Sequence, residues 1–207
     1  MKLQLALDQT ALADAMRVLE ATADLLDIAE VGTPLVLSEG ARAVREIRRH
    51  FPSLTICADF KVMDAGELEV SLGFTAGADI VTVLGAAETA TIRLACNAAR
   101  AARGSVMVDL IAVENIARRG VEASAAGADY LCCHAAFDTQ DTGGSPLAAL
   151  AKLRAAMPRA RIAVAGGITP DRLEALLPYA PEIVIVGGFV SSAEAPRAAA
   201  LAVRAAL

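Results

Sequence analysis

Aromatic residues are scarce in this sequence: they make up 3% of its 207 residues, and tryptophan is absent. Proteins that bind nucleic acid usually interleave basic side chains with aromatic ones on a positively charged surface. Here the formal net charge is −5, and no basic patch of that kind occurs. We therefore expect no nucleic-acid partner.

Long apolar runs are also missing, although hydrophobic residues make up 56% of the chain. No run approaches the roughly 18 residues that a membrane-spanning helix needs. The first stretch, MKLQLALDQT, is interrupted by Asp8 and is too short for a signal peptide. We therefore expect no membrane association.

Cysteine is limited to Cys57, Cys96, Cys132 and Cys133, and no CxxC pair occurs. Three of the four lie in apolar, strand-like runs. Disulfide frameworks and zinc sites need cysteines at paired or regular spacings. We therefore expect buried thiols in a reducing compartment, and we predict a cytoplasmic protein.

The chain does contain a regular alternation of short apolar runs with longer segments whose apolar residues recur every three or four positions. This is the pattern of strands that alternate with amphipathic helices. Eight such units at about 26 residues each predict a single-domain (β/α)8 TIM barrel over residues 1–207; a doubly wound open sheet is the alternative. The expected strands are residues 3–7, 26–30, 54–59, 79–85, 105–110, 129–134, 161–167 and 182–188.

A short internal repeat supports this reading. The tetrapeptide AGAD occurs at Ala76–Asp79 and again at Ala126–Asp129, 50 residues or two units later. Its glycine suits the left-handed position that closes a helix. We therefore expect each copy to end a helix and to open a strand.

Charged and imidazole side chains gather at one end of the expected strands. In barrels of this kind the catalytic groups lie where the strands end. The strand starts, by contrast, are mostly apolar or carry a single charge. We therefore expect an active site built from Asp8, Glu30, Asp59, Lys61, Asp109 and His134, in which Asp109 is among the substrate- and phosphate-binding residues.

Two glycine pairs, Gly166-Gly167 and Gly187-Gly188, follow the last two expected strands. Glycine lets the backbone approach a ligand closely and direct several N–H groups at one anion. In TIM barrels these two loops often bind phosphate. Tight turns are the alternative, but two pairs at these two places predict a phosphorylated ligand.

Glu30 and Asp59 end adjacent expected strands and could share a divalent cation, since Mg²⁺ prefers oxygen ligands and often uses one or two carboxylates. The alternative is that one of them caps a helix or pairs with Lys61. Carboxylates alone do not separate Mg²⁺ from Mn²⁺. His134, at a strand end, has the pKa range of a general base, with a structural histidine as the alternative.

The stretch from Asp59 to Asp64, DFKVMD, resembles the Asp-x-Lys-x-x-Asp signature of the orotidine monophosphate decarboxylase superfamily. Within it the chain resembles the 3-hexulose-6-phosphate synthase family over almost its full length. The similarity is carried by the segments MKLQLALD, IAEVGTPL, KVMDAGE, GADIVTVLGAA, VMVDLI, IAVAGGI and IVIVGG.

This resemblance implies a Mg²⁺-dependent aldol addition of formaldehyde to D-ribulose 5-phosphate, which gives D-arabino-hex-3-ulose 6-phosphate through a 1,2-enediolate. It implies that Glu30 and Asp59 hold the metal ion. It also implies that His134 takes a proton from C1 of the ketose.

The resemblance assigns roles to three further residues. Lys61 would add a positive charge beside the enediolate or the aldehyde oxygen. Asp8 would bind a substrate hydroxyl and help to orient Lys61. Asp64 would reach into the site of a neighbouring subunit, which implies a homodimer with active sites at its interface.

A sister family, the 3-keto-L-gulonate-6-phosphate decarboxylases, shares the enediolate intermediate. Its members use arginines at the two places where this chain has Phe137 and Gly188, which favours the synthase reaction. In one respect the chain departs from the synthases: Ala135-Ala136 follows the strand-six histidine, where Thr-Gly is common. This departure bears on efficiency and, to a lesser degree, on substrate choice.

Two other mechanisms are alternatives. A Schiff-base aldolase would use Lys61 as its nucleophile, but flanking carboxylates tend to keep a lysine protonated. A non-catalytic barrel that only binds sugar phosphate would keep the same pocket without turnover.

Overall fold

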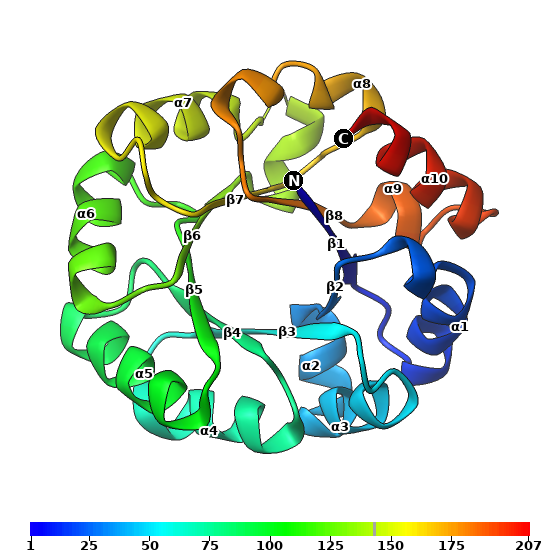
Figure 1. The fold of residues 1–207 in the computed structure, drawn as a ribbon, viewed down its shortest axis with the longest axis horizontal. Helices are drawn as coiled ribbons and strands as arrows, with labels where there is room; N and C mark the ends of the chain where they lie inside the picture. The colour runs from blue at the N-terminus through cyan, green and yellow to red at the C-terminus, as the bar shows by residue number, and fades with distance from the viewer. Residues whose placement is uncertain (143) are drawn as a thin grey trace.

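The computed structural model describes residues 1–142 and 144–207, and it forms a closed barrel of eight parallel strands (Figure 1). Each strand pairs with its neighbours in sequence, and the last pairs with the first. The predicted single-domain TIM barrel is therefore confirmed, and an open sheet is excluded. The strands are β1 (Lys2–Leu7), β2 (Ile28–Val31), β3 (Thr55–Val62), β4 (Ile80–Leu84), β5 (Ser105–Asp109), β6 (Tyr130–His134), β7 (Ile162–Ala165) and β8 (Ile183–Val186).

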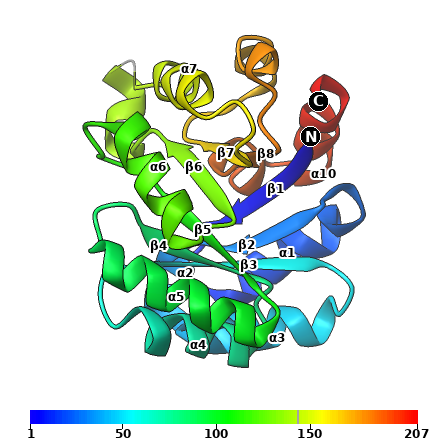
Figure 2. The same cartoon turned by 60° about the vertical axis from the view of Figure 1, so that its left-hand side comes forward.

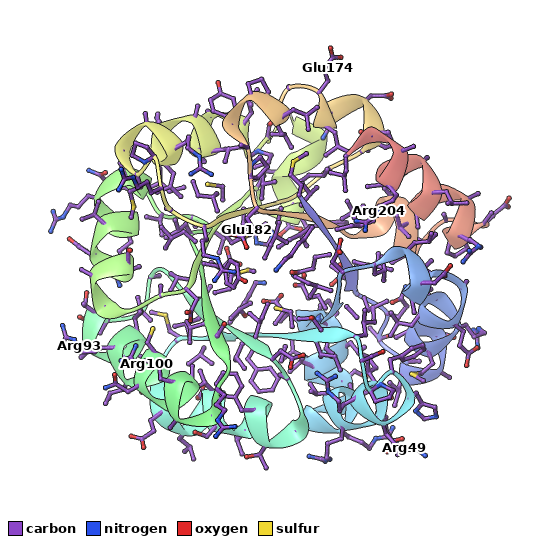
Figure 3. The ribbon with its side chains drawn as sticks, viewed as in Figure 1. Arg49, Arg93, Arg100, Glu174, Glu182 and Arg204 are labelled. Atoms are coloured by element: carbon purple, nitrogen blue, oxygen red, sulfur yellow. The ribbon has the colours of Figure 1, made fainter. Side chains whose placement is uncertain are left out.

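Helices surround the strands on the outside in both views (Figures 1 and 2). Exposed charges lie on their outer faces, as Figure 3 shows for Arg49, Arg93 and Glu174. The α-helices are α1 (Leu12–Thr22), α2 (Thr33–Glu39), α3 (Ala41–His50), α4 (Gly66–Ala76), α5 (Thr89–Ala102), α6 (Ile116–Ala126), α7 (Leu147–Ala156), α8 (Pro170–Leu173), α9 (Gly188–Ser191) and α10 (Pro196–Ala206). Three 3₁₀ helices are η1 (Ala23–Leu25), η2 (Phe137–Thr142) and η3 (Leu177–Tyr179).

The strands read as apolar runs because both of their faces are buried. One apolar core fills the space between strands and helices. A second core fills the barrel itself with side chains from all eight strands: Ala6, Ile28, Cys57, Ile80, Met107, Tyr130, Cys132, Ala163, Ala165, Ile183 and Ile185. Because side chains alternate along a strand, the next inward positions of β2, β3 and β5 are Glu30, Asp59 and Asp109.

The AGAD repeat has the predicted role. Gly77 ends α4 with φ of 104°, and Gly127 ends α6 with φ of 110°. Each accepts the left-handed conformation that L side chains avoid. β4 and β6 begin within three residues of these glycines.

All four cysteines are free and buried, as expected. Over the described residues, no helix is long and apolar enough to cross a lipid bilayer.

Candidate active site

β3 carries a bulge at the point where its charged residues lie. Ala58 pairs with Val81 and Val62 with Val83, so four steps along β3 match only two along β4. Within this bulge Lys61 adopts a left-handed backbone with φ of 47°, which costs a non-glycine residue about 1 to 2 kcal/mol. Backbone strain of this kind clusters at functional sites.

Thr82 of β4 stabilises the bulge. Its hydroxyl accepts the backbone N–H of Lys61 at 2.9 Å and donates to Oδ1 of Asp59 at 2.7 Å. Thr33, at the start of α2, donates to the other carboxylate oxygen of Asp59 at 2.6 Å. These two hydroxyls hold the Asp59 carboxylate in one orientation.

The Lys61 ammonium group is bracketed by carboxylates. It donates to Oδ2 of Asp59 and lies 3.5 Å from Oδ2 of Asp109. Burial alone would lower the pKa of Lys61, but the charges of Asp59 and Asp109 outweigh burial and raise it. A lysine held protonated in this way is a poor Schiff-base nucleophile.

His134 and Asp109 form a second pair at the ends of β6 and β5. Nδ1 of His134 lies 2.9 Å from Oδ2 of Asp109, and Asp109 is only 3% exposed. Burial would raise the pKa of Asp109, but the hydrogen bond and charge of His134, with the charge of Lys61, lower it. An ionised Asp109 favours the tautomer with the proton on Nδ1, which leaves Nε2 as the basic atom.

Asp109 was predicted among the substrate- and phosphate-binding residues. The structure places it against the imidazole of His134 and the ammonium group of Lys61. In this position it can orient the imidazole, as a carboxylate does for a catalytic histidine.

Glu30 is buried, with 7% of its surface exposed, and Oε2 accepts a hydrogen bond from Nε2 of Gln4 at 2.6 Å. Burial, followed by the nearby charge of Asp59, raises the pKa of Glu30 to about 8. A cation bound beside this carboxyl group would displace the proton to solvent, since a positive charge favours the ionised form.

Glu30 and Asp59 suit a divalent cation. In the part of the chain that the structure describes, no group of three or more His, Cys, Asp or Glu side chains is arranged to hold a metal ion. Mg²⁺ commonly binds through one or two carboxylates and completes its shell with water and substrate. Oε1 of Glu30 accepts no hydrogen bond from the described residues and is open to such a ligand role.

Asp8 lies between two glycines at the end of β1. A methyl group on Gly32 would lie 2.2 Å from Oδ1 of Asp8, and one on Gly187 would lie 3.2 Å from Oδ2. Both glycines therefore leave room for this carboxylate. Burial, followed by the charge of Asp59, raises the pKa of Asp8. No hydrogen bond joins Asp8 to Lys61 among the described residues, so a role in orienting Lys61 would act through charge.

The first glycine pair has the backbone that only glycine adopts easily. Gly166 and Gly167 have φ of 101° and 63°, and a methyl group on Gly166 would lie 2.2 Å from the carbonyl oxygen of Ala135. A cavity of about 340 Å³ opens beside both glycines, with Arg172 on its wall. The guanidinium of Arg172 donates to the Gly167 carbonyl at 2.9 Å.

The second glycine pair joins β8 to α9. Gly188 begins α9, and a methyl group there would meet no atom closer than 3.9 Å. Gly187 instead borders the carboxylate of Asp8. The loop therefore offers open space on one side, as a phosphate site requires, and an acidic neighbour on the other.

Asp64 is exposed and lies outside this cluster. Its Oδ1 accepts the backbone N–H of Ala65 at 2.7 Å, and no contact joins it to the other predicted site residues within the described structure. A function for Asp64 in a neighbouring subunit stays a prediction.

Sequence reasoning missed Gln4, Thr33 and Thr82. Gln4 and Thr82 are single polar residues inside apolar strands, LQLAL and DIVTVLG, where a buried polar side chain needs a partner. Thr33 follows Glu30 by three residues, at the first turn of a helix. These positions in the sequence were the signal by which the three residues could have been found.

Comparison with known proteins identifies the family of this chain. The model of the orotidine 5′-phosphate decarboxylase / HUMPS family matches residues 1–203. The 3-hexulose-6-phosphate synthase of Bacillus subtilis (strain 168) is 42% identical over 193 residues, which cover 93% of this chain and 92% of that protein.

Solved structures give the same result. A 3-hexulose-6-phosphate synthase from Salmonella typhimurium is 40% identical, with a TM-score of 0.97 over 100% of this chain and 98% of that chain. A 3-keto-L-gulonate-6-phosphate decarboxylase from Vibrio cholerae is 28% identical, with a TM-score of 0.88 over 99% and 96%. The predicted resemblance is confirmed: this chain belongs to the orotidine 5′-phosphate decarboxylase / HUMPS family.

Proposed function

We propose that this chain catalyses the aldol addition of formaldehyde to D-ribulose 5-phosphate, the reaction expected of a 3-hexulose-6-phosphate synthase. One observation carries the proposal: a histidine paired with a buried aspartate lies beside a protonated lysine and two further carboxylates at the carboxyl end of the barrel. The names of the full-length relatives support it.

In this reaction His134 takes a proton from C1 of the ketose, acting as a general base through Nε2. The electron pair of that C–H bond then forms the new bond from C1 to the carbon of formaldehyde. The proton passes to the formaldehyde oxygen. Asp109 keeps the imidazole in the basic tautomer and stabilises its protonated form.

Two groups meet the negative charge that develops on the ketose oxygens. Lys61 is held protonated by its carboxylate neighbours and contributes a fixed positive charge. Glu30 and Asp59 would hold Mg²⁺ or Mn²⁺, whose chemistry when bound is to stabilise such charge as a Lewis acid.

The glycine loops would bind the phosphate group through backbone N–H groups. This assigns Gly166, Gly167, Gly187 and Gly188 to substrate binding and leaves Asp8 to accept a hydrogen bond from a sugar hydroxyl. We further propose a homodimer in which Asp64, exposed and outside its own site, enters the site of the second copy.

The sister reaction, decarboxylation of 3-keto-L-gulonate 6-phosphate, is the second candidate, because a decarboxylase shares this fold at 28% identity. The residues at its two arginine positions argue against it. Phe137 is 81% exposed and uncharged, and Gly188 has no side chain.

An assay of two reactions tests the proposal. The purified protein is incubated with ribulose 5-phosphate and formaldehyde, with Mg²⁺ or with EDTA, and formaldehyde loss is followed. Carbon dioxide release from 3-keto-L-gulonate 6-phosphate is followed in parallel. Metal-dependent formaldehyde loss is expected. Carbon dioxide release without formaldehyde loss would assign the sister reaction, and inactivity in both would indicate a barrel that only binds.

A further inference from the structure

Gln4 is a polar residue enclosed in the apolar interior of the barrel, with 0% of its surface exposed. The reaction proposed above gives it no role. Nε2 donates to Oε2 of Glu30 at 2.6 Å, whereas Oε1 has no hydrogen-bond partner within the described residues. A buried amide oxygen without a partner destabilises the fold, and an apolar residue of similar size would avoid that penalty.

The strand register shows from which side this amide approaches. Gln4 is aligned with Ile28 of β2, and Ala6 is aligned with Glu30. Gln4 therefore lies two residues below Glu30, on the side of the barrel interior away from the mouth. Asp59 lies at the carboxyl-terminal side, since Glu30 is aligned with Cys57 of β3.

The Glu30 carboxyl group is thus held by a hydrogen bond from one side only, the side away from Asp59. The Gln4 amide occupies one oxygen from below, and the other oxygen accepts no hydrogen bond among the described residues. A carboxylate fixed through one oxygen can present the second in a single orientation, and outer hydrogen bonds of this kind orient metal ligands in proteins.

We propose that Gln4 is a positioning residue for the cation site: its amide holds one oxygen of Glu30 so that the other faces a divalent cation shared with Asp59. The inference rests on the proposed function only for its use of a cation. It predicts that Gln4 sets cation affinity and has little influence on the chemical step itself.

Manganese binding to the substrate-free protein tests this inference. Mn²⁺ is titrated into the wild type and into Gln4→Met, and free Mn²⁺ is read by electron paramagnetic resonance. Removal of an outer hydrogen bond typically weakens metal affinity by about 10- to 100-fold, and we expect that loss here. At saturating Mn²⁺ the turnover of Gln4→Met should approach that of the wild type, because only the occupancy of the site has changed.

Gln9→Met is the matched control. Gln9 also donates one hydrogen bond, to the carbonyl oxygen of Ser191 at 2.7 Å, and its Oε1 is also buried without a partner. Among the described residues no hydrogen bond joins Gln9 to Glu30, so the Mn²⁺ affinity of Gln9→Met should equal that of the wild type. Gln4→Leu replaces Gln4→Met if the methionine variant does not unfold as cooperatively as the wild type.

Equal Mn²⁺ affinity in the Gln4 variant and the wild type would overturn the inference. So would an equal loss in the Gln4 and Gln9 variants, or a wild type that binds no Mn²⁺. None of these results depends on formaldehyde consumption. Failure of the positioning role is therefore distinguishable from failure of the proposed reaction.

Discussion

At the amino-terminal end of the barrel, three aspartates each accept the backbone N–H of the preceding strand at 2.7 or 2.8 Å. These pairs are Asp27 with Leu3, Asp79 with Ile56, and Asp129 with Val106. Arginines balance the charge there: Arg204 pairs with Asp27, Arg48 with Asp79, and Arg161 with Glu182. Arg204 and Glu182 are labelled in Figure 3.

At the carboxyl-terminal end, the carboxylates outnumber the basic side chains that pair with them. Among the described residues, Lys61 pairs with Asp59 and Asp109, and His134 pairs with Asp109, whereas Asp8 and Glu30 have no ion pair. Asp59 accordingly raises the pKa values of both Asp8 and Glu30, in addition to burial.

The difference suits charge that stabilises the fold at one end and, in the proposed function, binds the cation and the substrate at the other. At the amino-terminal end Asp27, Asp79 and Asp129 each accept a backbone N–H from a strand, and these hydrogen bonds stabilise the barrel. At the carboxyl-terminal end Oε1 of Glu30 accepts no hydrogen bond from the described residues, which leaves it available for the proposed cation. At this end Glu30 and Lys61 have strongly raised pKa values, and Lys61 has a left-handed backbone, features that are common at functional sites.

Removal of the His134 imidazole is expected to have the largest effect of the changes considered. We expect His134→Ala to lower kcat for formaldehyde consumption by about 10²- to 10⁴-fold, the usual contribution of a general base. His50→Ala, on the exposed end of α3, is the matched control and should leave kcat unchanged. Retention of full activity in His134→Ala would remove the histidine from the mechanism.

A second prediction concerns stability and pH in the metal-free protein, with EDTA present. Glu30 has a pKa of about 8 when folded and an ordinary value near 4.5 when unfolded. The folded state therefore binds the proton more tightly, and this group lowers stability progressively as the pH rises from about 5 to about 8. Glu30→Gln removes the titration.

Urea unfolding of wild type and Glu30→Gln at several pH values measures this effect. The variant should gain on the order of a few kcal/mol relative to the wild type over that pH range. A stability difference that does not change with pH would contradict the account of Glu30.

The smallest effect is expected from a substitution at the amino-terminal end of the barrel. Asp129→Ala leaves the backbone N–H of Val106 without its acceptor, and we expect a loss of about 1 to 3 kcal/mol in the free energy of unfolding. Turnover per folded molecule should be unchanged, because the residue lies at the opposite end of the strand. A fall in kcat at full folding would mean that the two ends are coupled.

The sequence was sufficient to predict the fold because a buried parallel strand leaves an apolar run and a helix end leaves a glycine. The largest errors were at strand ends. β3 continues to Val62, three residues beyond its predicted end, through the bulge against β4. β7 ends at Ala165 and β8 at Val186, two residues before the predicted limits, because the glycines that follow lie in the loops or, for Gly188, at the start of α9.

The membership of the site was also partly predictable, since position at a strand end is a property of the sequence. Contacts between strands were not. The left-handed Lys61 follows from a bulge against β4, and the role of Thr82 depends on that bulge. The bond from Gln4 to Glu30 joins two side chains at different heights of the barrel, which no local pattern records.

The most direct test of the central claim is deuterium exchange at C1 of ribulose 5-phosphate. The protein and the sugar phosphate are incubated in D₂O with Mg²⁺ but without formaldehyde, and the C1 protons are followed by NMR. The account predicts deuterium at C1 with the wild type and none with His134→Ala. Formaldehyde consumption without any exchange at C1, or equal exchange by both proteins, would contradict proton abstraction by His134.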